Sequence, residues 1–385
     1  MPKRDLSILK THRPAVRHND ARPVLRHRPS LWTTITEYPT SGIWIRRRLQ
    51  YSQPYFTTTP TPRARITLWD KRPLHTQTQN YSYKMKQYKA EHLFPSHSGL
   101  GESPLYDPSS NSLFFVDIKN HFVHSVPLSL GWEGKRTYTF LEPITRLNLV
   151  KGRADLLAVQ TKLGFSLLDL KSGTLKPVAS IRHSGDEKEL DAKVRMNDGA
   201  IDARGRWWAG TMALDEESEI GRLWCLENGQ VREFPVEQDS GWPVPNGPVF
   251  SPDDRTMYAP QTPQSKIWKY DYDVETGRAA NRQLFAELDD GGMPDGLAVD
   301  KEGHVWAAAN SKGKLVRISP DGNVVAEVEV PGAKMTSCPA FGGEDMKTLF
   351  ITSISDDGSS GDVYQVKVDV EGIPRYEYQL DRRTA

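Results

Sequence analysis

The feature that most constrains the fold is a turn opened by an aspartate and followed by an apolar strand, which recurs from about residue 100 onward. The strongest copies have their aspartates at Asp107, Asp202, Asp253 and Asp300. Consecutive aspartates are 95, 51 and 47 positions apart, and the first gap contains a weaker copy at residues 151–159. A further copy follows at residues 343–351. Six units of roughly 40–50 residues have the period of propeller blades.

Short alternating runs indicate that these units are built from strands. Residues 314–318 and 324–330 alternate between apolar and polar side chains, and long amphipathic helical stretches are hard to find after residue 90. We therefore predict an all-β protein in which residues 88–385 form one six-bladed β-propeller around a central channel. Residues 1–87 are predicted to be an extension of low order that precedes it.

This N-terminal extension is basic and has no convincing repeat. Residues 1–86 contain 17 Lys and Arg against 4 Asp and Glu, in a chain whose net charge is +1. The composition fits a disordered tail, or upstream sequence included by an incorrect start codon. It also fits a mitochondrial transit sequence or a polyanion-binding arm, because phosphate contacts need little beyond positive charge. We expect a cytoplasmic protein, with a mitochondrial location as the alternative.

The remaining composition excludes several classes of protein. The chain has no run of about 18 apolar residues, so no membrane span is predicted. Two cysteines, Cys225 and Cys338, are too few for a disulfide framework, suit a reducing compartment and are expected to be small buried hydrophobes. A closed propeller protects its strand edges, so we expect a monomer or a weak oligomer. No nucleic acid is expected as a partner of the propeller.

Oxygen-bearing side chains occupy the same point of several repeats. Glu102, Asn197 and Asp295 each lie five positions before the aspartate of their own repeat. Asn246 precedes Asp253 at a slightly longer interval. If the repeats surround an axis, these groups converge on one site. Turn chemistry alone is the alternative, because Pro-Asn-Gly around Asn246 and Pro-Asp-Gly around Asp295 are strong turn sequences.

The chemistry of these groups suits a divalent cation. A glutamate, an aspartate and an asparagine carbonyl are hard ligands for Ca²⁺, Mg²⁺ or Mn²⁺, and Zn²⁺ also accepts them. Two converging carboxylates repel, and a cation would remove that repulsion. Arg195 lies two positions before Asn197, so on a strand both side chains face the same way and offer donors to hydroxyl and carbonyl oxygens. A surface ion pair for Arg195 and an Asx turn for Asn197 are the alternative.

Several motifs, in order, make the chain resemble the senescence-marker-protein/gluconolactonase/luciferin-regenerating-enzyme-like family over about residues 90–360. They are Leu100-Gly-Glu-Ser-Pro, Arg195-Met-Asn-Asp-Gly, Trp208-Ala-Gly-Thr-Met, Asn246-Gly-Pro-Val-Phe-Ser-Pro-Asp, Pro294-Asp-Gly-Leu-Ala-Val-Asp and Phe341-Gly-Gly. The resemblance implies a six-bladed propeller that holds one divalent cation in its channel. It also implies that the metal ligands are Glu102, Asn246 and Asp295.

By the same resemblance, Arg195 and Asn197 contact substrate oxygens, and Asp295 moves a proton while a sugar lactone is opened. A family glutamate near the substrate corresponds to Asp215, unless Glu216 takes its place. Residues 259–264 replace an acidic-Ser segment of the family and leave the identity of the lactone open. Three oxygen ligands also do not select among Ca²⁺, Zn²⁺, Mn²⁺ and Mg²⁺.

The leading hypothesis is therefore a metal-dependent hydrolase that opens an aldonolactone, such as a gluconolactone, or a similar cyclic ester. A calcium-binding regulatory protein of the regucalcin type is the second hypothesis. A scaffold with a vestigial channel site is the third, although the presence of all three ligands argues against it. Arg195 and Asn197 favour the enzyme, because a calcium buffer needs ligands but no donor wall for sugar hydroxyls.

Overall fold

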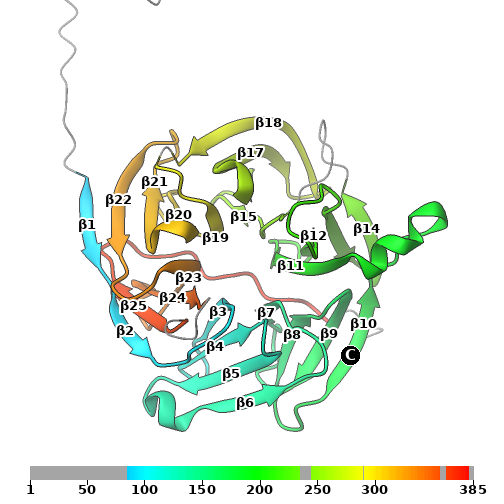
Figure 1. Ribbon diagram of the computed structural model, residues 1–385, viewed down its shortest axis with the longest axis horizontal. Helices are drawn as coiled ribbons and strands as arrows, with labels where there is room; N and C mark the ends of the chain where they lie inside the picture. The colour runs from blue at the N-terminus through cyan, green and yellow to red at the C-terminus, as the bar shows by residue number, and fades with distance from the viewer. Residues whose placement is uncertain (1–84, 235–243, 289, 356–360, 381–385) are drawn as a thin grey trace, which may run out of the picture. The chain divides into compact units, whose positions relative to one another are not determined.

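Six sheets surround a central channel in the computed structural model, which describes residues 85–234, 244–288, 290–355 and 361–380 (Figure 1). The predicted six-bladed propeller is confirmed. The predictions about residues 1–84 lie outside the described residues. The predicted junction at residues 87 and 88 falls within the first described strand, β1 (Lys86–Lys89). No helix in the described ranges is both long enough and apolar enough to cross a bilayer.

Each blade begins with its innermost strand and continues outward along the chain (Figure 1). Blades one to three consist of β3 (Gly101–Asp107), β4 (Ser112–Asp117), β5 (Phe122–Pro127) and β6 (Arg136–Thr139); β7 (Arg146–Leu149), β8 (Leu156–Gln160), β9 (Gly164–Asp169) and β10 (Leu175–Ser180); and β11 (Val194–Ile201), β12 (Trp207–Ala213), β13 (Arg222–Glu227) and β14 (Gln230–Phe234).

Blades four to six follow the same order. They consist of β15 (Val249–Phe250), β16 (Thr256–Gln261), β17 (Lys266–Asp273) and β18 (Arg278–Glu287); β19 (Pro294–Val299), β20 (Val305–Ala309), β21 (Lys314–Ile318) and β22 (Val324–Glu329); and β23 (Met335–Gly342), β24 (Thr348–Ile354) and β25 (Val363–Lys367). Four short 3₁₀ helices lie in the described connections: η1 (Gly131–Gly134), η2 (Gly185–Ala192), η3 (Thr262–Gln264) and η4 (Asn310–Lys312).

The recurring aspartates hold the turn between the first two strands of a blade. Asp300 Oδ1 accepts hydrogen bonds from the backbone N–H groups of Glu302 and His304, both at 3.0 Å. Its Oδ2 accepts the indole N–H of Trp306 at 2.9 Å. Asp202 repeats this arrangement with its own turn and with the indole N–H of Trp208 at 3.1 Å. The repeat is legible in the sequence because one carboxylate organises the turn and anchors the next strand.

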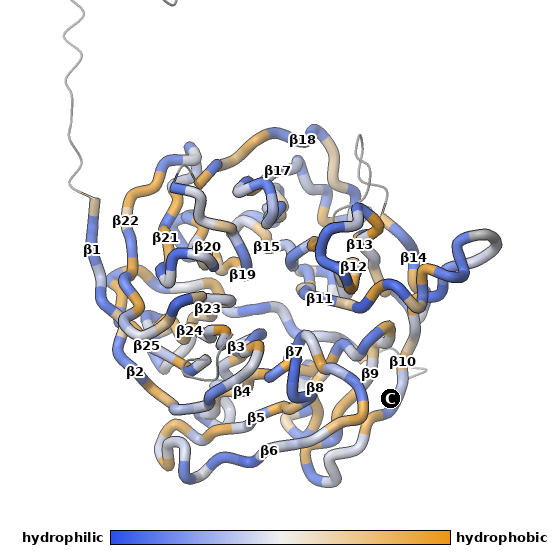
Figure 2. The backbone as a smooth tube through the Cα atoms, in the orientation of Figure 1, coloured by the Kyte–Doolittle hydropathy of each residue, from blue (hydrophilic) through white to orange (hydrophobic). Residues whose placement is uncertain are grey.

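The hydrophobic core is divided among the interfaces between blades. Six clusters of buried side chains each draw residues from two neighbouring blades. Trp207, Trp208 and Trp306 are among the largest fully buried side chains. Hydrophobic residues accordingly recur along the strands of every blade (Figure 2). Cys225 and Cys338 are free and buried, as predicted.

Both ends of the described propeller contribute to closing the ring. β2 (Glu91–Phe94) pairs antiparallel with β25 and completes blade six, whereas β1 pairs parallel with β22 at the edge of blade five. After β25, the C-terminal segment, residues 368–380, crosses the propeller (Figure 1). Gly372 forms a bridge with Asp300, and Tyr378 forms one with Val150. This segment therefore runs along the ends of the inner strands, where the aspartate turns begin.

Candidate functional site

The inner strands are irregular at the positions of the predicted site residues. Their pairing with the second strand shifts by one residue between Glu102 and Leu105 and between Met196 and Gly199. It shifts again between Pro294 and Leu297 and between Thr336 and Pro339. Such β-bulges leave residues unpaired and re-aim their side chains. The bulges therefore take Asn197, Asp295 and the two residues that follow Glu102 out of the regular ladder, whereas Glu102 itself stays paired with Val116.

Two carboxylates interact electrostatically near these bulges. Burial raises the pKa of Glu102 well above its ordinary value, and the nearby charges of Asp295 and Asp198 raise it further. Burial is also the main cause of the raised pKa of Asp295, with Asp198 adding to the rise. Hydrogen bonds from Asn310 and Asn246 oppose the shift of Asp295. The predicted convergence of acidic groups is therefore present in the fold.

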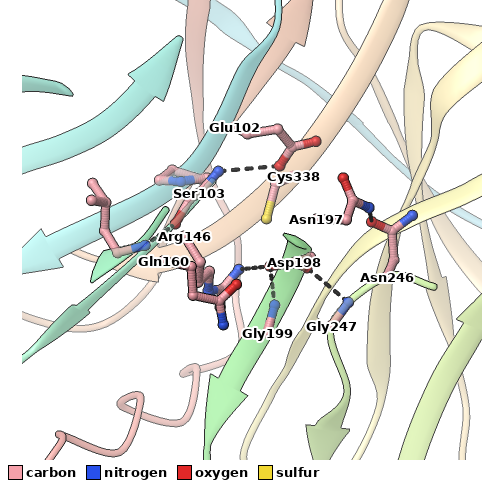
Figure 3. A network of polar contacts seen from close by, with 12 residues as sticks. Glu102, Ser103, Arg146, Gln160, Asn197, Asp198, Gly199, Asn246, Gly247 and Cys338 are labelled. Atoms are coloured by element: carbon pink, nitrogen blue, oxygen red, sulfur yellow. Dashed lines mark hydrogen bonds and ion pairs between the residues drawn. The ribbon is translucent and has the colours of Figure 1, made fainter. Parts of the chain in front are cut away.

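A chain of hydrogen bonds joins the predicted polar residues of blades three and four. Arg195 Nη1 donates to Asn197 Oδ1 at 3.0 Å. Asn197 Nδ2 donates in turn to Asn246 Oδ1 at 2.8 Å (Figure 3). Asn246 Nδ2 donates to Thr262 Oγ1 at 2.8 Å. These bonds orient the Asn246 oxygen, which has a second lone pair to offer. Burial lowers the pKa of Arg195, which lies near the carboxylates and Glu216.

Asp198 organises this part of the channel, and the sequence analysis did not single it out. Its Oδ1 accepts from Arg146 Nη1 and from the Gly199 N–H, both at 2.7 Å. Its Oδ2 accepts from the Gly247 N–H at 3.0 Å, so Asp198 links blades two, three and four (Figure 3). Arg146 is 5% exposed. The available signal was a charged residue at the first position of β7, directly before the buried Leu147.

Thr262 and Asn310 are two further residues that the sequence analysis missed. Thr262 Oγ1 accepts from Asn246 and donates to the carbonyl oxygen of Pro294 at 2.7 Å. Asn310 Nδ2 donates to Asp295 Oδ2 at 2.9 Å. Thr262 thus connects one predicted ligand to the residue before another. The sequence marked residues 259–264 as unusual, but it did not reveal a contact with β19.

The glycines of the Pro-Asn-Gly and Pro-Asp-Gly sequences allow close packing, and the turn interpretation was wrong. Asp295 and Gly296 lie within β19, and neither Gly247 nor Gly296 has a positive φ. A Cβ at Gly296 would approach Cys338 Sγ to 2.5 Å. A Cβ at Gly247 would approach Asp198 Oδ2 to 2.6 Å. These positions exclude a side chain because neighbouring blades meet there.

Asp215 has a local role in the structure. Its Oδ1 accepts the backbone N–H groups of Glu217 and Ser218, and its Oδ2 accepts the hydroxyl of Ser218 at 2.5 Å. Both carboxylate oxygens therefore hold their own turn. The charge of Glu216, by contrast, acts on Arg195. The structure thus favours Glu216 over Asp215 as the acidic neighbour of Arg195.

The donor set of the predicted metal site fits a hard divalent cation. It offers the carboxylates of Glu102 and Asp295 and the amide oxygen of Asn246. The raised pKa values of both carboxyl groups indicate charge that their protein neighbours do not fully compensate. Within the described ranges, no group of three His, Cys, Asp or Glu side chains is placed to hold a metal. The predicted set has only two acidic members, so its third ligand would be an amide.

Known proteins are similar to this chain in sequence. The sequence model of the SMP-30/Gluconolactonase/LRE-like region matches residues 100–355. Pentonolactonase XacC of Haloferax volcanii is 31% identical, over 74% of this chain and 95% of its own. A 6-deoxy-6-sulfogluconolactonase of Pseudomonas putida is 32% identical, over 71% of this chain and 93% of its own.

Solved structures give the same result. The crystal structure of a calcium-binding protein, regucalcin, from Agrobacterium tumefaciens superimposes with a TM-score of 0.68 at 27% identity, covering 77% of this chain and 99% of its own. The family match covers most of the propeller, from the start of β3 to the end of β24. The chain belongs to the SMP-30/Gluconolactonase/LRE-like family.

Proposed function

We propose that this protein is a divalent-metal-dependent hydrolase that opens a sugar lactone of the aldonolactone type. One observation carries the proposal: two carboxylates, the half-buried Glu102 and the buried Asp295, interact electrostatically beside a hydrogen-bonded row of Arg195, Asn197 and Asn246. The acidic pair could hold a cation and move a proton, and the donor-rich row could bind the oxygen atoms of the sugar. Hydrolysis of a lactone requires both. The lactonases among the relatives support the same reaction class.

Glu102, Asn246 and Asp295 would hold the cation. When bound, such an ion supplies Lewis acidity toward a carbonyl oxygen. Asp295 would be the residue that moves a proton between water and the ring oxygen, because a carboxylate at the cation would lie within reach of both. Its hydrogen bond to Asn310 fixes the orientation of the carboxyl group. The acid–base role and the ligand role thus fall on the same side chain.

Arg195 and Asn197 would orient the sugar. Arg195 is held by its bonds to the Met196 carbonyl and to Asn197, and its remaining N–H groups can serve as donors. A donor that is fixed before the substrate arrives stabilises developing negative charge without reorganisation. A calcium buffer would need affinity for the cation but no donors fixed in advance for a substrate. These donors therefore favour the enzyme.

Proton release from a panel of aldonolactones tests the proposal. Protein freed of divalent cations and then supplied with Ca²⁺, Zn²⁺, Mn²⁺ or Mg²⁺ is expected to acidify the solution faster than buffer alone. Asp295→Ala should abolish the gain, whereas Asp321→Ala, at an exposed position, serves as the matched control. If a cation binds and no lactone opens faster than in buffer, the calcium-binding function becomes the better one.

The calcium-binding function is the second candidate, supported by the structural likeness to the regucalcin of Agrobacterium tumefaciens. Calorimetric titration with Ca²⁺ separates it from the enzyme. Micromolar or tighter binding that survives Arg195→Ala without any lactone hydrolysis would favour it. We also expect the protein to act as a monomer or a weak oligomer. The extension predicted at residues 1–87 remains a proposal for residues before β1, since Lys86 and Gln87 pair with β22.

A further inference from the structure

The channel contains a second polar region at the opposite end of the inner strands from the candidate site. A cavity of about 80 Å³ lies there. Residues 373–376 of the C-terminal segment form part of its wall, and most of the remainder is apolar, including Val249, Leu297 and Phe341. The polar exceptions are Arg146, Asn148 and Arg375. We call these three residues, with the cavity that they line, the channel floor.

The channel floor contains an excess of positive charge. Arg146 pairs with Asp198 at 2.7 Å. Arg375 donates to two backbone carbonyl oxygens, those of Pro104 at 2.9 Å and Pro339 at 3.3 Å. Among the described residues, no carboxylate forms an ion pair with Arg375 within 4.0 Å. Of the two guanidinium groups, only that of Arg146 therefore has a carboxylate partner within this distance.

Burial and the neighbouring charge of Arg146 both act on Arg375. Burial lowers the pKa of Arg375 to about 10, and repulsion from Arg146 contributes to the shift. Arg375 nevertheless stays charged at neutral pH. An unpaired charge among apolar walls is costly, and the usual remedy in proteins is an oppositely charged partner.

Two buried donors on the channel floor also have no partner. Arg146 Nε and Asn148 Nδ2 form no hydrogen bond, although the two residues are 5% and 2% exposed. Arg146 and Asn148 are alternate residues of β7, so their side chains face the same side of the strand. A buried donor without an acceptor costs roughly 1–3 kcal/mol in general. The channel floor is therefore short of acceptors and of negative charge together.

We propose that the channel floor is a binding site for a small oxyanion, of the size of acetate or phosphate. The cavity has room for such an ion, since one water needs roughly 10–15 Å³ of comparable volume. Guanidinium groups bind carboxylate and phosphate oxygens through paired N–H groups. The bound ion would join β7 to the C-terminal segment that carries Arg375. The site uses none of the predicted metal ligands, although the charges of Arg146 and Asp198 act on Glu102.

Thermal unfolding of the full chain in excess EDTA tests this site apart from the lactonase function. Acetate or phosphate replaces a bulky sulfonate buffer anion at constant ionic strength. We expect the Tm to rise by about 2–3 °C at tenfold excess over the dissociation constant, and to keep rising with the logarithm of the anion concentration. Arg375→Met should lose this rise. Arg153→Met, which removes an exposed arginine paired with Asp155, should keep it.

Two outcomes would overturn the proposal. In the first, neither anion stabilises the unmodified protein more than the sulfonate does. In the second, Arg375→Met responds as the unmodified protein does, which would indicate a general salt effect on the surface. Should Arg375→Met not fold, Asn148→Leu replaces an unpartnered donor by an apolar side chain of similar size. Calorimetric titration of that variant with acetate should show at least tenfold weaker binding, and unchanged affinity would equally contradict the site.

Discussion

Asp295 and Asp300 lie five positions apart on one stretch of chain, and they are 8% and 0% exposed. Asp300 accepts two backbone N–H groups and the indole of Trp306, and it pairs with Arg317 Nε at 2.8 Å. Asp295 accepts from Asn310, and among the described residues no cationic side chain forms an ion pair with it. Both carboxylates are thus buried, but only that of Asp300 is compensated by a cationic side chain and several donors. A compensated carboxylate holds the fold, whereas an uncompensated one is suited to binding a cation or transferring a proton.

Removing Asp295 is the strongest way to test this comparison. We expect Asp295→Ala to lower kcat/KM for a lactone by about 10³-fold, because it removes the acid–base group and a ligand together. The free energy of unfolding without metal should stay within about 1 kcal/mol, since burial already disfavours the charge of this group. Steady-state kinetics and urea unfolding measure both. Activity within tenfold of the unmodified protein would remove Asp295 from the reaction.

Asp300→Ala should show the reverse pattern. It leaves the indole of Trp306, two backbone N–H groups and one contact of Arg317 without an acceptor, so we expect unfolding to become easier by about 3–5 kcal/mol. The fraction that remains folded should keep its kcat. Urea unfolding together with active-site titration checks this. A variant that is stable but inactive would contradict the assignment of Asp300 to the fold.

Thr262→Val tests whether the candidate site around Asp295 depends on a hydroxyl that positions its neighbours. The change removes the acceptor of Asn246 and the donor to Pro294 while it keeps the shape of the side chain. We expect metal affinity or kcat/KM to fall by about 10–100-fold, which is the usual effect of removing a hydrogen-bond partner of a metal ligand. Thr262→Ser keeps the hydroxyl and should restore most of the loss. Equal values for the valine and serine variants would show that the hydroxyl has no positioning role.

His124 is a buried titratable residue outside the candidate site. Its expected effect, on the pH dependence of stability, is the smallest of the four. Burial beside Phe115 and Trp132 lowers the pKa of His124 to about 4. The folded state therefore binds a proton less readily than the unfolded state, so stability is highest above about pH 6.5 and falls toward pH 4, by at most about 3 kcal/mol. Urea unfolding between pH 4 and pH 7 measures this slope. His124→Gln should flatten it, and an unchanged slope would assign the pH dependence to other groups.

The propeller could be predicted because its repeat is local. Asp202 and Asp300 bond to their own turns and to a tryptophan six positions later, so the pattern lies within one short stretch of sequence. The weak copies at 151–159 and 343–351 also lead into strands, β8 and β24. The strands predicted at 314–318 and 324–330 correspond to β21 and β22.

The candidate site could be predicted only in part. The common position of Glu102, Asn197, Asn246 and Asp295 in their repeats predicted that they converge, and the structure brings them together. Neither the bulges nor the role of the glycines was visible, since both depend on the neighbouring strand or blade. The partnerships of Arg146 with Asp198 and of Thr262 with Pro294 span 52 and 32 positions. No local pattern encodes them.

By itself, the sequence determined that six similar units surround an axis, and that acidic and amide side chains occur at one level of it. It could do so because turn residues and strand alternation act over a few positions. Only the tertiary structure decided which of these groups is compensated. Compensation depends on the donors and charges that other blades and the C-terminal segment bring within about 3 Å, and those contacts exist only once the ring has closed.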